Sequence, residues 1–122
     1  MDEKTKESLY AKFKKGYERT FEYENPEEVV SFISMWGRIE LKIEAMSVWD
    51  NEELLENEAL LDEVIIDTVD STGSSSQGTK LKMVRNWMAT EALVELTLQE
   101  TSFYICILHM LYNDEIVKRG NK

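Results

Sequence analysis

The spacing of apolar residues between positions 29 and 46 limits the fold more than any other feature of this chain. Apolar residues follow one another there in alternating steps of three and four, which places all of them on one face of an α-helix. A half-buried strand would instead need alternation at every second residue. The spacing therefore predicts a helix that packs nearly in line with other helices. The residues of this seam are Val29, Phe32, Trp36, Ile39, Ile43 and Met46.

Helix start signals place further helices around this one. Asn25 can cap a helix, Pro26 suits its first turn, and Glu28 can close a capping box. Asp50 and Glu53 form a second capping signature. The predicted helices span residues 3–23, 26–48, 51–70 and 79–118.

The first helix has an alternative end. Apolar residues at successive steps of four predict that it continues to residue 23. Gly16 follows two lysines and is an alternative helix stop. If the helix ends there, residues 20–24 can form a short strand.

The remaining segment, STGSSSQGT at residues 71–79, contains only small and polar residues and predicts a flexible loop. A chain of 122 residues with 43% apolar and 31% charged residues is typical of one folded domain. We therefore expect a single all-α domain over residues 1–122. Its predicted architecture is a four-helix bundle whose long C-terminal helix is the centrepiece.

The negative charge of the chain is concentrated in one segment. The formal net charge is −10, and residues 50–70 hold nine carboxylates without a lysine or arginine. Residues 1–19, in contrast, carry six bases and four acids. Because such a segment repels phosphate groups, we expect no direct contact with nucleic acid. A basic protein is the partner that this charge favours.

The carboxylates of the predicted helix 51–70 gather on one side of it. At 100° per residue, five of them fall within about 60° of the circumference. At about 1.5 Å per residue they would form an acidic ridge roughly 27 Å long. Most other positions are apolar, with Glu58 and Asp62 as exceptions, so we expect burial on the remaining sides. The acidic ridge consists of Glu52, Glu56, Glu63, Asp67 and Asp70.

Three explanations of the acidic ridge remain open. It can serve solubility alone, because net charge keeps a small protein dispersed. It can be neutralised within the chain. It can also be a docking surface that steers a basic cleft toward it, as a mimic of nucleic acid would. The bases available for neutralisation are Lys12, Lys14, Lys15, Arg19, Lys80, Lys82 and Arg85.

The sequence EELLE at residues 52–56 contains an EExxE pattern. It resembles the first half of the motif of the all-helical, MazG-type nucleotide pyrophosphohydrolases, in which carboxylates on two helices hold Mg²⁺ beside a triphosphate. The resemblance covers five residues and implies a metal-dependent hydrolase. The second half, ExxD on another helix, is not matched, because Glu58 with Asp62 and Glu63 with Asp67 have three intervening residues and share this helix.

His109 and Cys106 lie in the apolar run FYICILHMLY at residues 103–112, and we expect both side chains to be buried in the core. This run is well short of the roughly 20 residues that cross a bilayer. A single cysteine cannot form an internal disulfide, and the charged N-terminal residues do not resemble a secretory signal. The expected location is the cytoplasm.

Together these features predict a small acidic binding or regulatory protein without enzymatic activity. It would dock the acidic ridge on a basic protein such as a nuclease or a DNA-binding protein. Small size and acidity favour an inhibitor or adaptor of the phage or mobile-element kind. We expect no cofactor, no bound metal and no membrane segment.

Two alternative functions remain. One is the MazG-like pyrophosphohydrolase. The other is a structural or assembly subunit that works as a homo-oligomer, such as a homodimer. Such an assembly would share either the seam of residues 29–46 or a surface formed by Trp36, Trp49 and Trp87 between copies.

Overall fold

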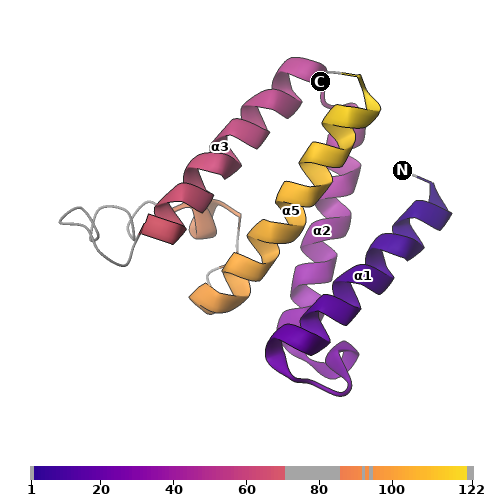
Figure 1. The fold of residues 1–122 in the computed structure, drawn as a ribbon, viewed down its shortest axis with the longest axis vertical. Coiled ribbons are helices and arrows are strands. Elements are labelled where there is room, and N and C mark those ends of the chain that lie inside the picture. The colour runs from indigo at the N-terminus through magenta and orange to yellow at the C-terminus, as the bar shows by residue number, and fades with distance from the viewer. Residues whose placement is uncertain (1, 71–85, 92, 94, 121–122) are drawn as a thin grey trace. The chain divides into compact units, whose positions relative to one another are not determined.

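The computed structural model describes residues 2–70, 86–91, 93 and 95–120, and it does not describe the side chains of residues 65–70. Every regular element in these ranges is a helix, so the all-α prediction is confirmed (Figure 1). The chain forms two compact units, Met1–Trp49 and Asp50–Lys122, each described by itself below. The four-helix bundle and the single domain stay predictions. The predicted loop at 71–79 lies outside the described residues.

The N-terminal unit begins with helix α1, Glu3–Phe21. The carboxylate of Asp2 caps it by accepting a hydrogen bond from the backbone N–H of Thr5 at 2.8 Å. Gly16 lies inside α1, so the alternative helix stop is wrong. The alternative strand at 20–24 is wrong as well, because the chain turns at Glu22, whose φ of 57° is left-handed.

Helix α2, Val30–Val48, begins four residues later than predicted. Pro26–Glu28 form a short 3₁₀ helix, η1, and Asn25 makes no side-chain capping bond. The N–H of Val29 closes this turn on the carbonyl of Pro26 at 2.9 Å, and Val29 itself is extended. The predicted capping box with Glu28 is therefore wrong. Burial of Pro26 holds the turn, and an ion pair of 2.8 Å between Glu27 and Lys14 ties it to α1.

An aromatic cluster forms the core between α1 and α2. Phe13 is fully buried and stacks on Phe32, with 4.7 Å between ring centroids, and on Trp36 at 5.7 Å. The Tyr17 and Ser31 hydroxyl groups are 2.6 Å apart and share a hydrogen bond. The buried residues of α1, Leu9, Phe13 and Tyr17, thus face the seam of α2, as the apolar spacing in both helices predicts.

The C-terminal unit begins with helix α3, Asn51–Asp70, whose bounds agree with the prediction. The carboxylate of Asp50 accepts a hydrogen bond from the N–H of Glu53 at 2.8 Å, which confirms this capping signature. The predicted continuous helix 79–118 is wrong. Residues 86–90 are helical, the chain leaves the helical conformation between them and Thr97, and helix α5 spans Leu98–Lys118.

A capping box starts α5 and explains this break. The Thr97 hydroxyl accepts from the N–H of Glu100 at 3.1 Å, and the Glu100 carboxylate accepts from the N–H of Thr97 at 2.9 Å. Leu93 and Leu96 are buried just before it, so the connection is packed against the unit.

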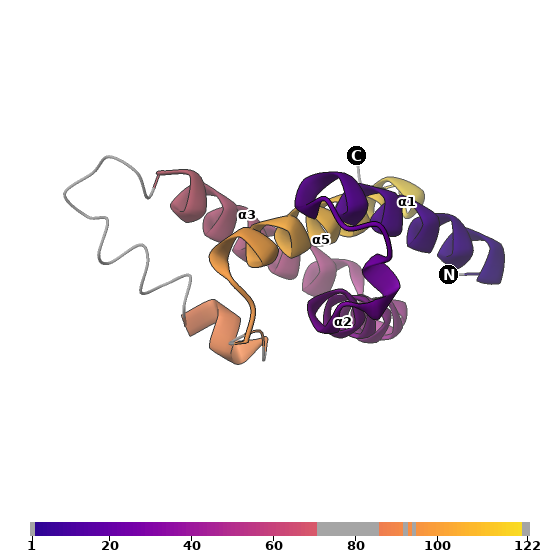
Figure 2. The same cartoon turned by 90° about the horizontal axis from the view of Figure 1, so that it is seen from below.

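Helices α3 and α5 pack against each other (Figures 1 and 2). They are antiparallel, because the N-terminal Asn51 accepts a hydrogen bond from Arg119 near the end of α5. The core of the unit is built from one apolar face of each helix and the segment before α5. Its residues include Leu54, Leu61, Val64, Trp87, Met88, Tyr104, Leu108, Leu111, Tyr112 and Ile116.

Candidate functional site

The described part of the acidic ridge lies at the surface of α3. Glu52, Glu56 and Glu63 are all exposed. The backbone is helical as far as Asp70, so the helical register assumed for the ridge is confirmed. The side chains of Asp67 and Asp70 lie outside the described residues.

No base of the described C-terminal unit neutralises these three carboxylates. Within residues 50–70, 86–91, 93 and 95–120, no ion pair joins Glu52, Glu56 or Glu63 to a lysine or arginine. Arg119 is bound elsewhere, because it donates to Glu115 at 2.8 Å. Lys80, Lys82 and Arg85, which could neutralise the ridge, lie outside the described residues, so neutralisation by them stays a prediction.

One of the bases predicted to neutralise the ridge is bound within the N-terminal unit. Lys14 pairs with Glu27 at 2.8 Å. The hydrogen bond to Glu27 raises the pKa of Lys14, and the same bond lowers the pKa of Glu27. Both shifts favour the charged pair. Neutralisation by Lys12, Lys15 and Arg19 stays a prediction.

The exposed face of α3 is wider than predicted. Leu55 and Leu60 are 44% and 49% exposed, and among the residues with described side chains only Leu54, Leu61 and Val64 are buried. The expectation of burial on most sides is therefore wrong. Its physical reason is that α5 covers one side of α3, so the apolar residues beside the acidic ridge remain in water.

Two residues that we expected in the core lie at the surface. Cys106 is exposed, and the side chain of His109 is 46% exposed. α5 buries the face that holds Tyr104, Leu108 and Tyr112, whereas Cys106 lies on the opposite side of the helix and His109 lies at the edge of the buried face.

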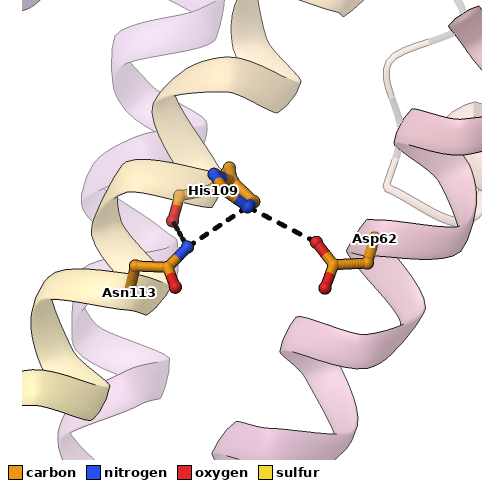
Figure 3. A network of polar contacts seen from close by, with 3 residues as sticks. All are labelled: Asp62, His109 and Asn113. Atoms are coloured by element: carbon orange, nitrogen blue, oxygen red, sulfur yellow. Dashed lines mark hydrogen bonds and ion pairs between the residues drawn. The ribbon is translucent and has the colours of Figure 1, made fainter. Parts of the chain in front are cut away.

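His109 is part of a polar cluster between α3 and α5. Its Nε2 lies 3.4 Å from Oδ1 of Asp62 and 3.2 Å from Nδ2 of Asn113 (Figure 3). One carboxylate oxygen of Glu58 completes the group, since the ligand atoms of Glu58, Asp62 and His109 all lie within 4.8 Å of one another. We call these three residues the His109 cluster.

The sequence contained a signal for this cluster. Glu58 and Asp62 are four residues apart and so share one face of α3, and that face is distinct from the acidic ridge. The sequence did not identify the third member of the cluster, because the spacing of Glu58 and Asp62 does not place His109 of α5 beside these two carboxylates. Among the described residues this cluster, and not the EELLE pattern, brings carboxylates together in a geometry for one metal ion. The MazG-like function stays a prediction.

Part of the surfaces predicted for self-association is internal, whereas Val29, Trp36 and Trp49 are only half-buried. Four residues of the seam, Phe32, Ile39, Ile43 and Met46, are buried, and so is Trp87. The opposite face of α2 carries exposed apolar residues, namely Val30, Ile33, Leu41 and Val48. The homo-oligomer stays a prediction.

None of the helices in the described part of the chain combines the length and the apolar composition that crossing a bilayer requires. No protein-family profile, curated protein or solved structure matches the chain.

Proposed function

We propose that this chain is an acidic binding protein that docks the exposed face of α3 on a basic protein, in the way that a strand of nucleic acid would. The observation that carries the proposal is the exposure of Glu52, Glu56 and Glu63 without a base of the described C-terminal unit beside them. Carboxylates in this state give the face a negative potential, which is strongest at low salt. Such a field steers a basic cleft toward the face and accelerates association.

The geometry of the face suits a partner that normally binds phosphates. At about 1.5 Å per residue, Glu56 lies roughly 6 Å along the helix from Glu52, and Glu63 lies roughly 10 Å further on. A nucleic acid strand likewise presents a row of negative charges to the protein that binds it. A partner occupied by α3 would lose access to nucleic acid, so the proposed role is regulatory and requires no catalysis.

The exposed leucines add specificity to this charge. Leu55 and Leu60 lie on either side of the acidic ridge and are about half exposed. Burial of such side chains in an interface adds roughly 25 cal/mol for each Å² of apolar surface. The proposed partner therefore has a basic groove with apolar walls, a surface that free nucleic acid fills less completely.

Competitive elution from a nucleic acid column tests this function. Proteins from an extract of the source cells are bound to DNA-cellulose and eluted with purified chain. A variant with Glu52→Gln, Glu56→Gln and Glu63→Gln should elute the same basic protein at least about tenfold less effectively, which corresponds to about 1.4 kcal/mol of lost binding. The eluted protein is then purified and its affinity for both chains is measured directly.

A matched control removes the same charge elsewhere. Glu24, Glu28 and Glu44 are exposed residues of the N-terminal unit, and replacing them by Gln changes the net charge equally. This control should elute the partner as the unchanged chain does. Equal elution by all three proteins would contradict the proposal, because net charge alone would then be responsible.

A further inference from the structure

We propose that Glu58, Asp62 and His109 form a binding site for a divalent transition-metal ion, with Zn²⁺ as the preferred ion. This inference is independent of the proposed docking function, since it uses a different face of α3. The site would join α3 to α5 and leave at least one coordination position open.

The fold places the three ligands by elementary helix geometry. Glu58 and Asp62 are one turn apart on α3, so their carboxylates extend from the same face. The antiparallel packing of α5 brings His109 opposite Asp62 (Figure 3). Leu61 and Leu108, the chain neighbours of Asp62 and His109, are buried at 2% and 0% exposure and anchor the two backbones. The ligands therefore project from rigid elements.

The distances fit one tetrahedral ion. Ligand atoms that each lie about 2.0–2.1 Å from a Zn²⁺ ion are roughly 3.3–3.4 Å apart in a tetrahedral arrangement. Nε2 of His109 and Oδ1 of Asp62 are already 3.4 Å apart. The Glu58 oxygen lies within 4.8 Å of both, so its side chain has to move closer for all three groups to bind one ion.

Asn113 lies beside the ring nitrogen of His109 that would bind the metal ion. Its amide nitrogen donates to the carbonyl of His109 at 2.8 Å and lies 3.2 Å from Nε2. Because this nitrogen carries only donors, Nε2 can accept from it only when the ring nitrogen holds no proton. The lone pair that would accept this bond is also the one that would bind a metal ion, so an ion would displace the Asn113 N–H from Nε2 and lie beside Asp62 and Glu58. A cation placed there would interact favourably with all three groups.

The ligand types select the class of ion. Mg²⁺ and Ca²⁺ prefer ligand sets made of oxygen, whereas imidazole suits Zn²⁺ and its transition-metal neighbours. One nitrogen and two carboxylates leave a position for water, as in open zinc sites. The side chains of His109 and Asp62 are 46% and 45% exposed, so an ion can enter from solvent.

Titration with ZnCl₂ and with CoCl₂ tests the site on the full chain. Calorimetry should show one equivalent of Zn²⁺, and Co²⁺ should give the intense visible absorption of tetrahedral coordination. His109 is the single histidine of the sequence, so its imidazole signals in an NMR spectrum report on the site without ambiguity. These signals should shift with Zn²⁺ and stay unchanged with Mg²⁺.

Substitutions separate this site from general attraction to carboxylates. Asp62→Asn and His109→Gln should each weaken Zn²⁺ binding by at least about tenfold, and Zn²⁺ should raise the melting temperature of the unchanged chain but not of these two variants. Cys106→Ser and the triple Gln variant at Glu52, Glu56 and Glu63 should bind as the unchanged chain does. Circular dichroism checks that each variant remains helical.

Three results would overturn the proposal. The first is unchanged binding in Asp62→Asn and His109→Gln, and the second is loss of binding in the triple Gln variant, because either would assign the ion to other carboxylates. The third is an absence of the Co²⁺ absorption together with constant imidazole signals. In that case the His109 cluster would be a surface hydrogen-bond network only.

Discussion

At the scale of single residues, Tyr112 shows how burial couples a side chain to pH. It lies on α5 at 3% exposure, and burial raises the pKa of its hydroxyl, with the carboxylate of Glu91 acting in the same direction. The folded chain therefore keeps this proton at a pH at which the unfolded chain, with a tyrosine pKa of about 10, releases it. The resulting stability is present below about pH 10 and is lost as the pH rises above it.

Replacing Tyr112 by Phe should remove this part of the pH dependence. We expect the free energy of unfolding to fall between pH 9 and pH 11.5 in the unchanged chain and to fall less steeply in Tyr112→Phe. Urea denaturation at fixed pH values measures both slopes. Tyr10, whose pKa is also raised by burial, will leave a residual slope.

The exposed Tyr23 provides the control for this experiment, since it is 47% exposed. Tyr23→Phe should retain the slope of the unchanged chain. If Tyr112→Phe and Tyr23→Phe give the same slope, the Tyr112 hydroxyl is not responsible for the alkaline loss of stability.

Residue identity alone predicted the burial of His109 and Cys106 wrongly. Both have apolar neighbours in sequence, and the run that contains them has too many apolar residues to reveal which face of the helix is buried. The exposed side of α5 also carries Val117, at 63% exposure, so hydropathy does not separate the two sides. The position of α3 decides which side of α5 is buried, and that position is a property of tertiary packing.

At the scale of elements, α2 contains a glycine in its interior without a structural requirement for it. A Cβ atom added to Gly37 would meet nothing within 4 Å. Glycine in a helix interior costs about 0.5–1 kcal/mol relative to alanine, because the unfolded chain has more conformational freedom to lose. We expect Gly37→Ala to raise the free energy of unfolding by this amount, as measured by urea denaturation.

Gly120 provides the opposite case just after α5. It follows the last turn of that helix with a φ of 75°, and its N–H donates to the carbonyl of Val117 at 3.0 Å. A side chain is strained in this conformation, so Gly120→Ala should lower the free energy of unfolding by about 1 kcal/mol. If Gly37→Ala and Gly120→Ala change the free energy of unfolding equally, the local backbone conformation does not explain the effect of either substitution.

The existence of the helices was predictable, but two of their ends were not. The period of the seam predicted α2, and the capping signature at Asp50 predicted α3. Both signals depend only on residues that are close together in the sequence. The signature at Asn25 was followed by a 3₁₀ turn, since burial of Pro26 fixes a tighter geometry. The break before Thr97 was missed, because the capping box of Thr97 and Glu100 lies within a sequence that lacks glycine and proline.

At the scale of the whole molecule, the helical class followed from periodicity, and the candidate sites followed only in part. Register on one helix is enough to place Glu52, Glu56 and Glu63 on a common exposed line. The His109 cluster combines residues of two helices, and Asp62 and His109 are 47 positions apart in the sequence. The spacing of residues within one helix does not determine contacts between residues so far apart in the sequence.

The net charge of −10 predicts how the stability of the whole chain responds to salt. Compact chains of high net charge are destabilised by their own repulsion. The screening length falls from about 30 Å in 0.01 M salt to about 10 Å in 0.1 M salt, so repulsion across the molecule weakens over this range. We expect the free energy of unfolding to rise when NaCl increases from 0.01 M to 0.2 M.

The acidic ridge of α3 should account for part of this increase in the free energy of unfolding with NaCl. Like charges one helical turn apart destabilise a helix by about 0.2–0.5 kcal/mol for each pair, while the favourable effect of the helix dipole on Glu52 is confined to the first turn. The triple Gln variant at Glu52, Glu56 and Glu63 should therefore respond to NaCl by about 0.5 kcal/mol less than the matched variant at Glu24, Glu28 and Glu44. Urea denaturation at each salt concentration gives the comparison. A stability that falls with NaCl would contradict this prediction, because attractive ion pairs would then outweigh the repulsion.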